Sequence, residues 1–116
     1  MCIRDSLKML RESLAKMPAD DRAMGERIHE LVSKAVPGLV PGTYYGMPSY
    51  RTEGKNGKTI GWYKPKSKFK VRYSTFGFQA DAHLDDGEMW GVEFAVIKLT
   101  PAVESKLVEL VKKAAG

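Results

Sequence analysis

Apolar residues recur every three or four positions near the start of this chain, the spacing that gathers side chains on one face of an α-helix. One such stretch runs from Leu7 to Met17, and Pro18 ends it. A second begins in the turn after Pro18, where a proline is well tolerated, and stops at Pro37-Gly38. Its apolar stripe comprises Met24, Ile28, Leu31, Val32 and Ala35. The pattern predicts two consecutive helices, each with one face packed on a core.

The same spacing returns at the end of the chain. Thr100 is suited to cap a helix, and Pro101 fits its first position. The inward positions of this predicted helix are Val103, Leu107, Leu110, Val111 and Ala114.

Between these helical patterns, short segments rich in β-branched and aromatic residues are separated by turn residues. The predicted strands are Thr43–Tyr45, Ser49–Thr52, Lys58–Tyr63, Phe69–Phe78 and Val92–Leu99. Asn56-Gly57 predicts a hairpin turn, because both positions tolerate a positive φ. Helices at both ends of an antiparallel run predict an α+β fold. We expect a two-layer sandwich of about five strands, with the N-terminal and C-terminal helices packed on one face.

Length and composition predict one cytoplasmic domain. The opening "MCIRDS" resembles a translated sequencing adapter, so we expect residues 1–6 to be a non-native leader and residues 7–116 to form the domain. Cys2, the single cysteine, leaves no disulfide framework and no cysteine-based zinc site. No apolar run approaches the ~20 residues that span a bilayer, so we expect no membrane partner.

Basic residues are concentrated in one segment of a chain whose net charge is +5. They are Lys64, Lys66, Lys68, Lys70 and Arg72. On an extended chain the last four share one side, while Phe69, Val71 and Tyr73 share the other. This pattern fits a module that binds an anionic ligand or nucleic acid, and it also fits a solvated edge strand whose lysines block pairing. Nucleic-acid modules interleave aromatic and basic residues on one face, which argues against nucleic acid here.

Acidic residues are concentrated in a different segment. Its candidate metal ligands are Asp81, His83, Asp85, Asp86 and Glu88, whose oxygen and imidazole groups suit iron or manganese. The spacing does not match a calcium-binding EF-hand loop. The alternative is a turn at Asp85-Asp86-Gly87 between the apolar anchors Leu84 and Trp90.

The stretch "TYYGMPSY" admits two interpretations. Gly46 permits unusual backbone angles and Pro48 holds Met47 extended, so a sharp turn between strands explains it without chemistry. The alternative is the rim of a small pocket, formed by Tyr45, Gly46, Met47, Pro48 and Trp90. No activated nucleophile or acid–base pair is apparent, so we expect a protein without enzymatic activity. His29 neighbours the apolar stripe, and we expect it to be half-buried or at the surface.

Together, "AVPGLVPGTYYGMPSY", "KFKVRYSTFGF", "AHLDDGEMW" and "FAVIKLTPAVESKLVELVKKA" resemble the YdhG-like family of domains of unknown function, from about Met17 to Ala115. The resemblance implies a frataxin-like fold. In one branch of the family it implies an intracellular iron chaperone that delivers iron to a protein partner. Iron would then bind surface carboxylates, either in the acidic segment or at Asp20, Asp21, Glu26 and Glu30.

Frataxin-like iron binding implies a broad acidic ridge on the surface. This chain differs from that pattern, because its net charge is +5 and arginines lie among the acidic residues of its helix. The leading hypothesis is a non-enzymatic domain that binds a metal ion or a partner protein, and the alternative is a module for anions.

Overall fold

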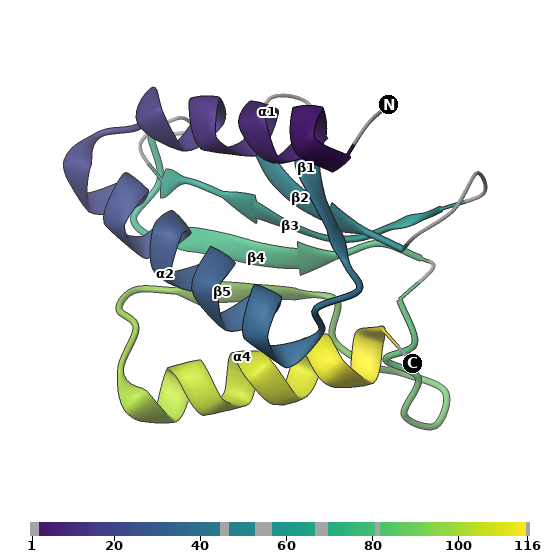
Figure 1. The fold of residues 1–116 in the computed structure, drawn as a ribbon. Helices are drawn as coiled ribbons and strands as arrows, with labels where there is room; N and C mark the ends of the chain where they lie inside the picture. Colours follow the sequence, from purple (N-terminus) through teal and green to yellow (C-terminus); the bar gives the residue numbers. More distant parts are fainter. Residues whose placement is uncertain (1–2, 45–46, 53–56, 67–69, 81, 116) are drawn as a thin grey trace.

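The computed structural model describes residues 3–44, 47–52, 57–66, 70–80 and 82–115, which form three helices and one five-stranded sheet (Figure 1). The helices are α1 (Ile3–Ala15), α2 (Ala19–Ala35) and α4 (Pro101–Ala114). The strands are β1 (Val40–Tyr44), β2 (Met47–Arg51), β3 (Thr59–Lys64), β4 (Ser74–Phe78) and β5 (Glu93–Val96). They lie in the order β1-β2-β3-β4-β5, and each neighbouring pair is antiparallel.

The helices form one layer and the sheet forms the other, which confirms the predicted α+β sandwich. Figure 1 shows α1, α2 and α4 on the same side of the sheet, with α1 over β1 and β2. Within the described residues, every helix is too short or too polar to cross a membrane.

The core lies between these layers. The strands supply mainly large aromatic side chains, namely Tyr50, Tyr63, Phe76 and Phe78. The helices supply aliphatic ones, including Leu10, Leu14, Ile28, Val32, Leu107 and Val111. The Tyr63 hydroxyl donates a hydrogen bond to the backbone oxygen of Asp21 at 2.9 Å, which fixes α2 against β3. The helices bury one face with a period of 3.6, whereas β2, β3 and β4 are buried at consecutive positions.

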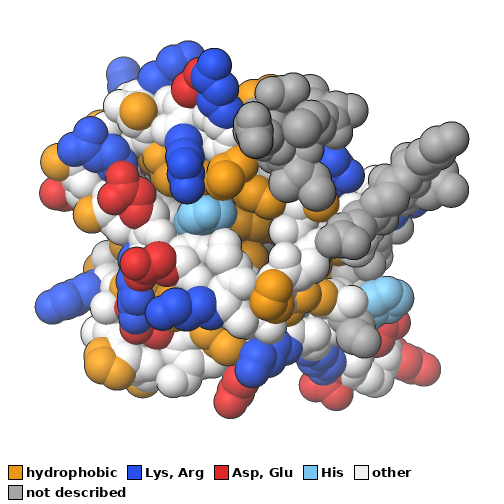
Figure 2. Space-filling view, in the orientation of Figure 1, with side chains coloured by type: hydrophobic (Ala, Val, Ile, Leu, Met, Phe, Trp, Pro, Cys, Tyr) orange, Lys and Arg blue, Asp and Glu red, His pale blue; other side chains and the backbone are white. Residues whose placement is uncertain are grey.

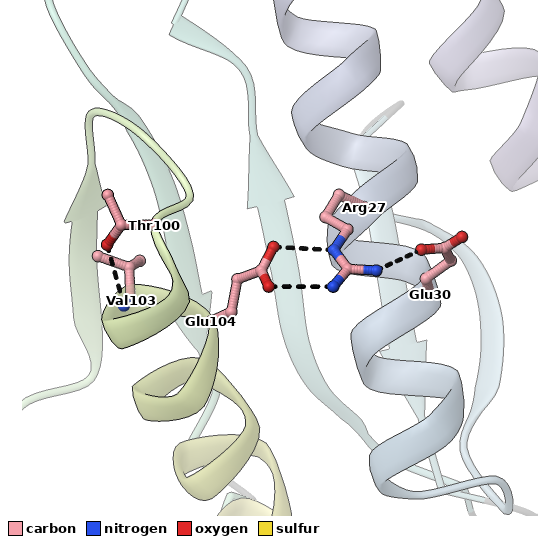
Figure 3. Close-up of polar contacts among 5 residues, drawn as sticks. All are labelled: Arg27, Glu30, Thr100, Val103 and Glu104. Atoms are coloured by element: carbon pink, nitrogen blue, oxygen red, sulfur yellow. Dashed lines mark hydrogen bonds and ion pairs between the residues drawn. The ribbon is translucent and has the colours of Figure 1, made fainter.

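The N-terminus of α4 is stabilised as its sequence predicts (Figure 3). The Thr100 side chain accepts a hydrogen bond from the Val103 backbone N–H at 3.3 Å, and Pro101 occupies the first turn. Arg27 of α2 binds both carboxylate oxygens of Glu104, at 2.8 and 3.0 Å, and also contacts Glu30. This arginine lowers the pKa of the Glu104 carboxyl, because its hydrogen bonds favour the charged form. The fork-shaped guanidinium thus links the two helices.

The predicted strand Phe69–Phe78 is wrong in its first half, because β4 begins only at Ser74. The Val71 backbone N–H donates to the Lys66 oxygen at 3.2 Å, and the Lys66 N–H donates to the Ser74 hydroxyl at 3.2 Å. Lys70 has a φ of 53°, which an extended chain does not adopt. These contacts make the described part of this segment a loop, and Lys68 and Phe69 lie outside the described residues.

The other differences concern the ends of elements. β1 starts at Val40, before Pro41, and a proline is compatible with strand pairing here because β1 lies at the sheet edge. The β2–β3 hairpin closes with a hydrogen bond from the Thr52 N–H to the Lys58 oxygen at 3.0 Å. Asn56 of the predicted turn lies outside the described residues.

Candidate functional site

The stretch "TYYGMPSY" connects β1 to β2. β1 and β2 are antiparallel, with Tyr44 paired with Met47. Tyr45 and Gly46 of the predicted pocket rim lie outside the described part of the chain. Met47 and Pro48 are buried in β2, whereas Trp90 is partly exposed in the loop before β5. The pocket rim stays a prediction.

The last residue of that stretch makes a polar contact that the sequence did not indicate. The Tyr50 hydroxyl lies 3.1 Å from Nδ1 of His29, and the two rings stack with centroids 6.0 Å apart. Tyr50 is buried and alternates with Ser49 in β2, so its ring points toward the helices. His29 follows Ile28 on α2 and is half-buried, as expected. The contact therefore joins the sheet to the helical layer.

Burial favours the neutral form of both members of this pair. Burial raises the pKa of Tyr50 far above its ordinary value, so its hydroxyl stays protonated at neutral pH. Burial, and then the positive charge of Arg11, lower the pKa of His29, while Glu30 opposes them. With the imidazole proton on Nε2, Nδ1 accepts the hydrogen bond from the Tyr50 hydroxyl. In this tautomer the neutral His29 offers an N–H donor at Nε2.

The imidazole borders a cavity of about 520 Å³ between α1 and α2. The cavity is lined by Arg11, Leu14, Ala15, Arg22, Glu26 and His29. Figure 2 shows basic and acidic side chains interspersed on the face that carries the helices. We call this cavity the α1–α2 cavity.

Its chemistry is that of an anion site. Arg11 and Arg22 bring guanidinium groups from different helices, and a guanidinium binds carboxylate or phosphate through paired N–H donors. His29 adds a donor held in place by the Tyr50 hydroxyl. Sequence reasoning missed both arginines. The signal available to it was the spacing of Arg22, Glu26 and His29, at intervals of four and three, on one face of a helix.

The acidic segment lies on the surface. His83, Asp85, Asp86 and Glu88 are exposed, and Gly87 has a φ of 69°, which agrees with the predicted turn. His83 and Asp85 border a cavity of about 370 Å³ beside the last turn of α4. Among the described residues, no three His, Cys, Asp or Glu side chains are grouped so that they can hold a metal ion. Asp81 lies outside those residues, and the metal site stays a prediction.

The predicted basic stripe is not a stripe on one strand. Lys64 ends β3, whereas Lys66, Lys70 and Arg72 lie in the loop before β4. The Arg72 guanidinium lies 5.5 Å from the centroid of the Tyr73 ring. Because the chain turns at Lys70, the alternation that placed these charges on one side does not hold.

The remaining helix acids are divided among different contacts. Glu30 pairs with Arg27, Asp21 is buried, and Glu26 borders the α1–α2 cavity. Asp20, Asp21 and Glu104 line a cavity of about 400 Å³ together with Arg27, Lys66 and Lys98. Carboxylates and cations therefore share that surface.

The His29 contact predicts a pH dependence of folding. The folded pKa of His29 lies below the ordinary 6.5, so the unfolded chain binds more protons between these two values. The stability that neutral His29 contributes is present above pH 6.5 and is lost as the pH falls from 6.5 through the folded pKa of His29. His29→Gln keeps an acceptor for Tyr50 and is expected to reduce the slope of unfolding free energy against pH. Urea unfolding from pH 4 to 8 measures it, with His83→Gln, the same change at an exposed position, as the matched control.

No family model, no curated protein and no solved structure matches this chain. The resemblance to the YdhG-like family, and with it the frataxin-like fold, stays a prediction.

Proposed function

We propose that this chain is a cytoplasmic, non-enzymatic domain that binds a small anionic ligand in the α1–α2 cavity. The observation that carries the proposal is the convergence of Arg11, Arg22 and His29 on one cavity, with the imidazole held by the buried Tyr50 hydroxyl. A histidine positioned by a buried partner donates from a defined direction, at little entropic cost on binding.

The charges of the cavity restrict the ligand. Two guanidinium groups and one carboxylate, from Glu26, leave one excess positive charge while His29 is neutral. A carboxylate or phosphate group matches the two arginines, and Glu26 repels a second anionic group. Glu26 also accepts a hydrogen bond, so a ligand that carries a hydroxyl beside its anionic group is favoured over a simple dianion.

The proposed ligand is of the anionic class that the basic segment predicted, but the proposed site is the α1–α2 cavity. The Lys64–Arg72 segment is divided between the end of β3 and a loop, whereas the α1–α2 cavity gathers its donors from two packed helices. The implied iron chaperone, with a protein partner in iron or cluster delivery, stays a separate prediction for the acidic segment.

Titration with inorganic phosphate and with acetate, followed by amide NMR, tests the proposal. We expect the largest shifts at residues that line the α1–α2 cavity. The double variant Arg11→Ala/Arg22→Ala removes two charge-assisted contacts of ~1.5–3 kcal/mol each and is expected to weaken binding by ~100-fold or more. Lys106→Ala/Lys113→Ala removes the same charge from exposed positions of α4 and serves as the matched control.

The proposal is wrong if both double variants weaken binding equally, since this would indicate only a general effect of net charge. Shifts that centre on Lys64, Lys66 and Arg72 would instead favour the basic segment as the anion site.

A further inference from the structure

Exposed apolar side chains cluster around β5. Among the described residues, four of the six large hydrophobic side chains that are exposed lie just before or just after this strand. Met89, 88% exposed, precedes β5 together with Trp90 and Val92, and Ile97, 63% exposed, follows it. Scattered apolar residues are ordinary on a surface, but a group of them beside one strand marks an interaction site.

Acidic residues accompany this group along the sequence. Asp85, Asp86, Glu88 and Glu93 are exposed, and the sequence has no lysine or arginine between Arg72 and Lys98. In Figure 2 acidic side chains lie at the lower right, with lysine or arginine side chains beside them, where Figure 1 places the loop between β4 and β5. Residues 73–97 themselves carry acidic side chains and no lysine or arginine, on a chain whose net charge is +5. We call the surface that comprises residues 85–97 the β5 edge surface.

β5 lies at the edge of the sheet, where it pairs with β4. Natural edge strands are commonly protected by charged side chains, proline or short length; Glu93–Val96 is short but has no lysine or proline, and its one charged residue is acidic. Phe94 packs inward against Phe78, with ring centroids 6.1 Å apart, so β5 is held firmly to the sheet. Glu93 and Ala95 alternate with it and are exposed. Such an edge offers a backbone template for one more strand.

We propose that the β5 edge surface binds an extended basic segment of a partner protein, which adds to the sheet as a sixth strand. Backbone hydrogen bonds to β5 hold the segment. Its lysines or arginines pair with Asp85, Asp86, Glu88 and Glu93, and its apolar side chains contact Trp90, Val92 and Ile97.

Charge complementarity selects this occupant. A second copy that paired through the same edge would bring two sets of these carboxylates together, and like charges across a strand pair are destabilising. An acidic segment of a partner protein would be repelled by the same carboxylates. A basic extended segment gains from steering toward the acidic loop and from the apolar contacts beside it.

A short peptide of alternating lysine and valine tests the proposal, with a peptide of alternating glutamate and valine as its control. We expect the basic peptide to slow amide hydrogen exchange in Glu93–Val96 and to shift the Trp90 indole signal. The triple variant Asp85→Asn/Asp86→Asn/Glu88→Gln changes exposed side chains and is expected to weaken binding by ~10-fold or more at low salt. Glu12→Gln, an exposed acid on α1, is expected to leave it unchanged.

Three results would overturn the proposal. The first is equal affinity for the acidic and the basic peptide, and the second is full affinity in the triple variant. The third is protection of the β5 amides in a dimer without peptide. The last result assigns the edge to a second copy. The triple variant leaves the α1–α2 cavity intact, so phosphate titration of this variant tests the two proposals independently.

Discussion

Replacing Phe76 with alanine is expected to lower the free energy of unfolding by about 3–5 kcal/mol. Phe76 is 1% exposed and sits in the middle of β4, paired with Tyr63 on one side and Phe94 on the other. Its ring also meets Phe78 edge to face, with centroids 5.2 Å apart. Removing it leaves a cavity that three surrounding rings cannot fill without leaving their own contacts. A domain of this size is stable by only ~5–15 kcal/mol, so the loss is a large share of the total.

Urea unfolding followed by circular dichroism measures this loss. The matched control is Phe94→Ala, the same chemical change one strand further out, where the ring is only half-buried and the edge can relax. Phe94→Ala is expected to lower the free energy of unfolding clearly less than Phe76→Ala does. Equal losses for the two variants would contradict the placement of the core centre at β4.

The fold class could be predicted from periodicity because the spacing of apolar residues within a helix indicates which face is buried. The 3.6-residue stripe in α2 and the Thr100-Pro101 start of α4 are local properties that tertiary contacts reinforce. The segment before β4 shows where this reasoning fails. Residues 66–73 alternate like a strand, yet the Lys66 contacts with Val71 and Ser74 close a loop. Hydrogen bonds of this kind depend on chain geometry that alternation does not encode.

The candidate site was less accessible to sequence reasoning for a related reason. The contact between His29 and Tyr50 joins residues 21 positions apart, one on α2 and one on β2. The burial of His29 and of Tyr50 could be predicted from their own segments. The contact between them depends on how α2 crosses the sheet, which the sequence pattern does not indicate. Arg11 and Arg22 likewise share a cavity only because α1 packs against α2. The exposed acidic turn at Gly87 was predictable because it depends on local chain chemistry.

Replacing Gly77 with alanine is expected to destabilise the fold by about 1–3 kcal/mol. Gly77 of β4 pairs with Trp62 of β3, and a Cβ at this position would lie 2.3 Å from the nearest atom of the indole ring. The ring lies across the glycine, so the added methyl has to displace a buried tryptophan. The backbone conformation is ordinary for a strand, so no backbone strain adds to this loss of packing.

Gly61→Ala is the matched control for this substitution. It also adds one methyl to a strand glycine, but its nearest contact is an atom of the Phe76 ring at 3.2 Å, which a small shift relieves. We expect Gly77→Ala to cost more in urea unfolding and to change the buried Trp62 fluorescence, while Gly61→Ala leaves that signal nearly unchanged. Trp62 is buried and its Nε1 has no hydrogen-bond partner among the described residues, so displacing the ring exposes that N–H to water and offsets part of the packing loss. An unaltered Trp62 signal in Gly77→Ala would mean that the indole does not lie across β4.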